Sequence, residues 1–128
     1  MKARENALRL RRRDVEDKVR KVEDLERIIR EFDMMVVDLE RQIQAEEDRT
    51  GIRDPHHFSY STYAKSAAQR RDNLRTSTDG LRDQLASAVR DRDDATEQLA
   101  RTVAQAEPRD DMRSSRRRAE RSATAALR

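Results

Sequence analysis

The stretch Val22-Glu23-Asp24-Leu25-Glu26-Arg27-Ile28-Ile29-Arg30-Glu31-Phe32 carries two apolar rows at seven-residue spacing. The first row extends in both directions and comprises Leu8, Val15, Val22, Ile29, Val36 and Ile43. The second row lies three residues further on; it is apolar at Leu25, Phe32 and Leu39 and charged at Arg11, Lys18 and Glu46. Apolar rows with this spacing and charged flanks are typical of a coiled coil. We therefore expect a helix over residues 3–49, with Leu10 and Val19 partly filling the N-terminal gaps.

The second half of the chain repeats this pattern with smaller side chains. One row comprises Tyr60, Ala67, Leu74, Leu81, Ala88, Ala95 and Thr102. The other row is mixed and contains Ala64, Arg71, Thr78, Leu85, Arg92, Leu99 and Ala106. Small residues let two helix axes approach closely, and the larger side chains of the first half would fill the space between them. We expect a second helix over residues 61–107, packed weakly where Lys18, Arg71 and Arg92 approach the seam.

Residues 50–60 hold most of the chain's turn-forming residues. Gly51 suits a left-handed helix cap, Asp54 and Pro55 suit a short turn, and Ser59 or Ser61 can cap the second helix. A connection of this length reverses the chain direction. The predicted fold class is therefore all-α, a long two-helix antiparallel coiled-coil hairpin. Facing pairs in it are Ile43 with Ala67, Phe32 with Thr78, and Leu25 with Leu85.

The composition excludes several other classes of protein. Charged residues make up 43% of the chain and hydrophobic residues 34%, and there are two glycines and two prolines, which disfavours a globular sheet protein. The chain has no cysteine, which excludes disulfides, thiolate metal sites and a cysteine nucleophile. It has no apolar run of about 18 residues and no apolar signal core after Met1. We expect a soluble, unexported protein in a reducing compartment.

No residue pattern in the chain predicts catalysis or metal binding. His56 and His57 are adjacent, and adjacent side chains do not converge on one metal ion from a simple turn. The many carboxylates lie at helical spacings that favour pairs with arginine on solvated faces. A phosphate-binding loop and a Ser/His/Asp arrangement are both absent from the sequence. We expect a non-enzymatic protein without a cofactor or small-molecule substrate.

Charge is distributed unevenly along the chain. Net charge is +5 over residues 1–21, −6 over 22–54, zero over 55–107 and +4 over 108–128. A hairpin would bring the two basic segments to one end and leave the acidic stretch at the other, beside the aromatic residues Phe58, Tyr60 and Tyr63. Pro108 lacks a backbone donor and disfavours helix at Glu107. The tail over 108–128 is therefore expected to fray or to be helical beyond a bend.

Two clusters of residues allow more than one interpretation. Arg11-Arg12-Arg13 and Arg116-Arg117-Arg118 could neutralise nucleic-acid phosphates. No aromatic residues are interleaved for base stacking, and acids interrupt both segments, which disfavours nucleic acid. Docking on an acidic protein surface is as good a use of the same residues. Tyr60 is expected to cap the core, whereas Phe58 and Tyr63 fit partner contact and local packing equally well.

The loop region resembles the FliJ family of flagellar export proteins in its alphaproteobacterial form. The resemblance is carried by Ala45-Glu46-Glu47-Asp48-Arg49-Thr50-Gly51-Ile52-Arg53-Asp54-Pro55, His57-Phe58, Tyr60, Thr62-Tyr63-Ala64-Lys65 and Gln69-Arg70-Arg71-Asp72-Asn73-Leu74. The opening, Met1-Lys2-Ala3-Arg4-Glu5 and Leu8-Arg9-Leu10, is also similar. The resemblance covers about residues 1–106, and the loop is its distinctive part because any coiled coil shares the heptads.

This resemblance implies a non-enzymatic stalk of the flagellar type III export apparatus, similar to the shaft of rotary ATPases, that serves motility. It implies that the end with both termini docks into the ring of the export ATPase, with Arg4, Arg9, Arg11, Arg12 and Arg13 as candidates. The body or loop end would contact the cytoplasmic domain of the export gate through Phe58, Tyr60 and Tyr63. Export chaperones are further implied partners. The implied location is cytoplasmic, peripheral to the inner membrane. The tail after Pro108 departs from the family pattern, so no tail contact is carried over.

Overall fold

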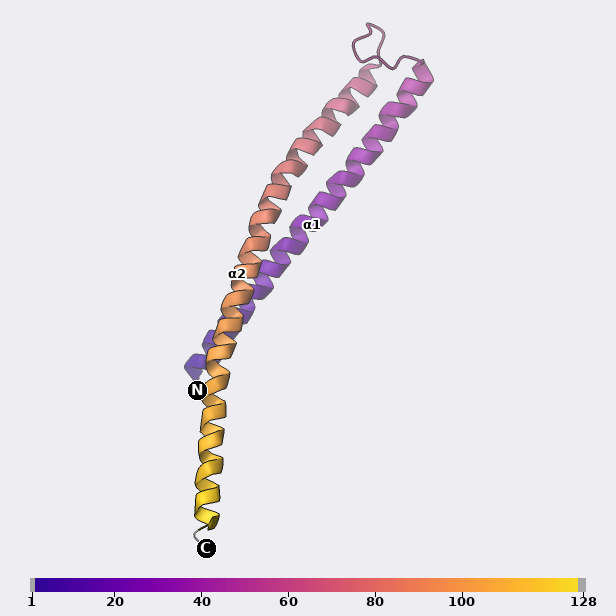
Figure 1. Ribbon diagram of the computed structural model, residues 1–128. Helices are drawn as coiled ribbons and strands as arrows, with labels where there is room; N and C mark the ends of the chain where they lie inside the picture. The colour runs from indigo at the N-terminus through magenta and orange to yellow at the C-terminus, as the bar shows by residue number, and fades with distance from the viewer. Residues whose placement is uncertain (1, 127–128) are drawn as a thin grey trace. The chain divides into compact units, whose positions relative to one another are not determined.

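The structure, a computed structural model, describes the backbone of residues 2–126 and the side chains of residues 2–105 and 121. It is all-α, with helix α1 over Lys2–Thr50 and helix α2 over Thr62–Ala126. A loop over residues 51–61 joins them, and the two helices pack against each other as a helical hairpin (Figure 1). The fold class predicted from the heptads is confirmed.

The contacts divide the chain into two compact units. The loop unit is Arg20–Val89, and the terminal unit is Met1–Val19 together with Arg90–Arg128. Each unit contains a segment of α1 and a segment of α2. Each therefore has its own portion of the helix–helix seam.

The loop unit holds two apolar clusters. In one, Leu39 and Ile43 of α1 are buried with Ala64 and Ala67 of α2, and Leu74 packs against them. In the other, Val22 and Leu25 are buried with Ala88, and Leu81 and Leu85 pack against them. The expected pairing of Ile43 with Ala67 and of Leu25 with Leu85 agrees with these clusters.

One predicted seam pair differs from this pattern. Thr78 is buried, but Phe32 is only partly buried. The Thr78 hydroxyl donates to the carbonyl of Leu74, one turn earlier in α2, at 2.8 Å. A buried hydroxyl that is satisfied by its own helix needs no polar partner from α1. A threonine can therefore occupy the seam without an unpaired polar group.

The terminal unit has a thinner seam. Of the side chains described there, only Ala95 is buried, while Leu8, Val15 and Leu99 are partly exposed. Leu10 is 67% exposed, so the prediction that it partly fills the N-terminal gap is wrong. Successive residues of a helix are rotated by about 100°, which carries Leu10 off the seam that Leu8 and Arg11 follow.

Helix α2 continues past position 108 to Ala126 instead of ending near residue 107. Of the two expectations for the tail, the backbone follows the helical one. A proline inside a helix removes one backbone hydrogen bond, and the bonds on either side can still form. Flexibility of residues 108–128 stays a prediction, and the side chains of Arg116-Arg117-Arg118 lie outside the described residues.

Candidate interaction surfaces

Hydrogen bonds fix the loop between the helices at both of its ends and in its middle. Gly51 has φ +74°, and its N–H donates to the Glu47 carbonyl at 2.8 Å, which is the expected left-handed cap of α1. The Asp54 carboxylate accepts the N–H of His56 at 3.0 Å, and the backbone carbonyl of Asp54 accepts the N–H of His57 at 3.1 Å. Ser61 Oγ accepts the Ala64 N–H at 3.3 Å and so caps α2, as one of the two predicted serines.

The three candidate gate-facing aromatics have different environments. Phe58 is 95% exposed, and its ring stacks on the ring of His57 with centroids 4.7 Å apart. The Ser59 N–H donates to His57 Nδ1 at 3.0 Å, which holds the histidine ring in place. Phe58 is therefore an apolar side chain offered to solvent from a hydrogen-bonded loop.

Tyr63 and Tyr60 are each bonded to α1. Tyr63 is 57% exposed, and its hydroxyl donates to Gln42 Oε1 at 3.0 Å. Tyr60 packs against the Leu39–Ile43 cluster, as expected for a residue that caps the core. Its hydroxyl donates to Glu47 Oε1 at 3.1 Å, and burial, with this bond, raises its pKa. Phe58 and Tyr63 are accessible, whereas Tyr60 serves mainly to hold the loop.

Glu46 is a loop-holding residue that the sequence pattern did not identify. Its carboxylate accepts from Arg49 Nε at 3.1 Å, from Arg49 Nη2 at 2.5 Å and from Ser61 Oγ at 2.8 Å. The bonds from the arginine first, and then the bond from the serine, lower the pKa of Glu46 to about 2. The heptads marked Glu46 only as a charged end of the seam. The i, i+3 spacing to Arg49 was visible in the sequence, but the contact with Ser61 depends on how the chain reverses.

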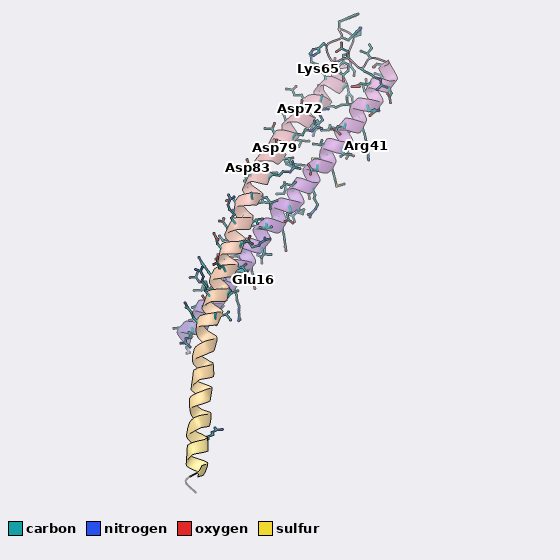
Figure 2. The ribbon with its side chains drawn as sticks, in the orientation of Figure 1. Glu16, Arg41, Lys65, Asp72, Asp79 and Asp83 are labelled. Carbon is teal, nitrogen blue, oxygen red and sulfur yellow. The ribbon has the colours of Figure 1, made fainter. Side chains whose placement is uncertain are left out.

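The five candidate ring-facing arginines belong to the terminal unit, and their environments differ. Arg9, Arg12 and Arg13 are exposed and line a shallow depression together with Glu5 and Glu16 (Figure 2 labels Glu16). Arg11 Nη1 donates to Gln98 Oε1 of α2 at 2.6 Å. Arg4 is partly buried. Three of the five candidates therefore share one surface with two glutamates, which leaves that surface a net charge of +1. Arg11 ties the two helices of this unit together.

Ion pairs also link the helices of the loop unit. Arg75 of α2 pairs with Glu40, and Arg82 of α2 pairs with Asp33 at 3.4 Å. All four side chains are about half exposed, so each pair contributes little free energy, about 0–1 kcal/mol. Their main effect is on register, because a shifted pairing of the helices would separate both pairs.

Within the described residues, no group of three or more His, Asp or Glu side chains is placed to hold a metal ion. Over the same part of the chain, neither helix has a stretch apolar enough to cross a lipid bilayer. Comparison with protein-family models, with curated proteins and with solved structures found no match to this chain.

Proposed function

We propose that this chain is a non-enzymatic component of the flagellar type III export apparatus that couples the export ATPase to the export gate. The observation that carries the proposal is the loop, whose sequence resembles the FliJ family and whose backbone presents Phe58 to solvent at 95% exposure. The hairpin supports the proposal because it is the fold that this resemblance implies.

The loop has the physical properties of a recognition element. An exposed aromatic side chain loses unfavourable contact with water when it enters a pocket on a partner, and such residues dominate the binding free energy of many interfaces. The bonds around Asp54, His57 and Ser61 already order the loop. Little conformational entropy is then lost on binding. We assign the contact with the export gate to Phe58 and Tyr63, with Tyr60 as support.

The basic surface of the terminal unit suits the second partner. Exposed arginines accelerate association with an acidic surface and fix its orientation. Arg9, Arg12 and Arg13 share one surface, and we assign the contact with the export ATPase to them. The proposed location is the cytoplasm, peripheral to the inner membrane, and export chaperones are further proposed partners.

The test uses the full chain with the export ATPase and the gate's cytoplasmic domain from the same host. We expect Phe58→Ala to weaken binding to the gate domain by about tenfold or more and to leave ATPase stimulation unchanged. Replacing Arg9, Arg12 and Arg13 with Glu should weaken ATPase stimulation and leave binding to the gate domain unchanged. Met35→Ala, which truncates an exposed apolar side chain outside both assigned surfaces, is the matched control and should leave both contacts unchanged. Failure of the unaltered chain to bind either protein would overturn the proposal.

A second candidate function is an arginine-ended coiled-coil scaffold for nucleic acid or another acidic partner. The same exposed Arg9, Arg12 and Arg13 favour it. A salt titration on duplex DNA separates the candidates. Micromolar affinity at physiological salt, falling steeply as salt rises, would favour the scaffold. Absence of such binding, with binding to the ATPase intact, would favour the export component.

A further inference from the structure

The seam between α1 and α2 contains one layer with a cation on each side. Leu25 and Leu85 belong to the same apolar cluster, which gives the register of the two helices. Both rows continue at seven-residue spacing, and the next position of each is Lys18 in α1 and Arg92 in α2. These two residues belong to the terminal unit. Two like charges therefore occupy positions that leucines fill one heptad away.

This layer weakens the pairing of the helices. Lys18 and Arg92 are both partly buried, so neither is simply directed into solvent. The carboxylate that pairs with Arg92 is Asp93, the next residue of the same helix, at 3.1 Å, and this pair does not draw α1 toward α2. The aliphatic stems let both cations reach water at the edge of the seam. Facing like charges still repel each other, and the stems bury less apolar surface than two leucines would.

The other contacts between the helices of the terminal unit are few. The Arg11–Gln98 hydrogen bond, at 2.6 Å, is exposed to solvent. Among the side chains that the structure describes in this unit, no ion pair joins α1 to α2, whereas two such pairs join the helices of the loop unit. Both apolar clusters also belong to the loop unit, and Ala95 is the one buried side chain described in the terminal unit. The two units therefore differ in how firmly their helices are paired.

We propose that the terminal unit opens and recloses while the helices of the loop unit stay paired, and that the Lys18–Arg92 layer sets the open population. Opening separates residues 2–19 of α1 from residues 90–105 of α2. Segments with few buried apolar contacts and exposed hydrogen bonds open locally at a free-energy cost well below that of global unfolding. The proposed ATPase-facing arginines lie on residues 2–19 and move with them. The opening is a property of the fold, so the inference goes beyond the proposed function and does not rest on it.

Fraying of the chain ends is a different process from this opening. Fraying begins at the termini and depends on the residues there. The Lys18–Arg92 layer lies at the inner boundary of the terminal unit, next to residues 20 and 89 of the loop unit. A change confined to this layer alters the proposed opening and leaves fraying at the ends as it was. Substitution at positions 18 and 92 therefore distinguishes the two processes.

The experiment measures distances between the helices in the full chain. The sequence contains no cysteine, so spin labels attach only to introduced ones. One chain carries Asn6→Cys and Ala104→Cys in the terminal unit, and a reference chain carries Glu31→Cys and Asp79→Cys in the loop unit; all four positions are exposed. Pulsed electron paramagnetic resonance, in an excess of unlabelled chain, reports distances within one molecule. We expect one narrow distance for the reference pair and an additional, longer population for the terminal pair.

Two double variants of the terminally labelled chain complete the test. Lys18→Leu with Arg92→Leu restores a leucine layer and should reduce the longer population by about tenfold or more. Lys21→Leu with Arg90→Leu removes the same two charges from exposed positions and should leave that population unchanged. A single narrow distance for the terminal pair would overturn the proposal. So would a longer population that persists in the first variant, or one that falls equally in both.

Discussion

The hydroxyl of Tyr60 donates a hydrogen bond to Glu47 Oε1 at 3.1 Å, joining the end of the loop to the last turn of α1. The neighbouring carboxylate, Glu46, accepts the hydroxyl of Ser61 at 2.8 Å. Two consecutive glutamates thus hold two consecutive loop residues. The position of the loop relative to the end of α1 depends on both contacts, and each can be removed without altering the helices.

Tyr60→Phe removes the hydroxyl and keeps the ring against the Leu39–Ile43 cluster. We expect a loss of about 0.5–1.5 kcal/mol in the free energy of unfolding, the range for one partly exposed hydrogen bond. Urea denaturation measures it. Tyr63→Phe, whose more exposed hydroxyl contacts Gln42, is the control and should lose less. Equal losses would contradict a special role for the Tyr60–Glu47 bond.

Glu46→Gln should change how stability depends on acid. The pKa of Glu46 is lowered to about 2 by its bonds to Arg49 and Ser61, so its ionised form is favoured in the folded chain. Its contribution is complete above the unfolded-state pKa, near 4.5, and is lost as pH falls through about 2. The melting temperature, measured between pH 6 and pH 2, should therefore fall less steeply with decreasing pH in the variant. Glu31→Gln, at an exposed position of α1, should keep the original decline.

Leu39→Ala should destabilise the hairpin by about 2–4 kcal/mol, because it removes a buried side chain that α2's alanines cannot replace. Phe32→Ala should have a smaller effect, since Phe32 is only partly buried. Met34→Ala, at 69% exposure, serves as the control and should change stability by less than about 0.5 kcal/mol. Chemical denaturation compares the three. A loss below about 0.5 kcal/mol for Leu39→Ala would contradict the observed seam.

The two glycines should respond oppositely to alanine. A Cβ at either Gly51 or Gly80 would meet no atom within 4 Å, so only backbone conformation separates them. Gly51 has φ +74°, and Gly51→Ala should destabilise by about 1–2 kcal/mol. Gly80 lies inside α2, and Gly80→Ala should stabilise by up to about 1 kcal/mol. Melting temperatures that move in the same direction would contradict the difference in backbone conformation.

The heptads and turn residues predicted most of the fold because both act locally. Seven-residue spacing places Val22, Ile29 and Ile43 on one side of α1, and Gly51 supplies a conformation that few other residues adopt. The prediction that Leu10 fills part of the seam was wrong because an apolar residue next to a seam position can still face water. The continuation of α2 past position 108 depends on how a long helix tolerates one lost bond, which the residue type alone does not determine.

The candidate surfaces were less predictable than the fold. The sequence predicted that Tyr60 caps the core, and Tyr60 packs on it. For Phe58 and Tyr63 the sequence favoured neither packing nor exposure, and only the course of the loop shows that both are exposed to solvent. Met34, Met35 and Val37 are exposed although Val36 between them is buried, and the heptads specify only Val36. A run of apolar residues that includes seam positions is easily assigned entirely to the seam, although one helical turn points in every direction.

The large side chains of α2 in the loop unit lie between its small buried residues. Ala64, Ala67 and Ala88 offer α1 only methyl groups, whereas Leu74, Leu81 and Leu85 pack against the two clusters. These leucines oppose longitudinal sliding of the helices by steric contact. The covalent turn with its Tyr60 and Ser61 bonds opposes it as well, aided by the Arg75–Glu40 and Arg82–Asp33 pairs. A pull along one helix of this unit would be shared between the leucines and the turn.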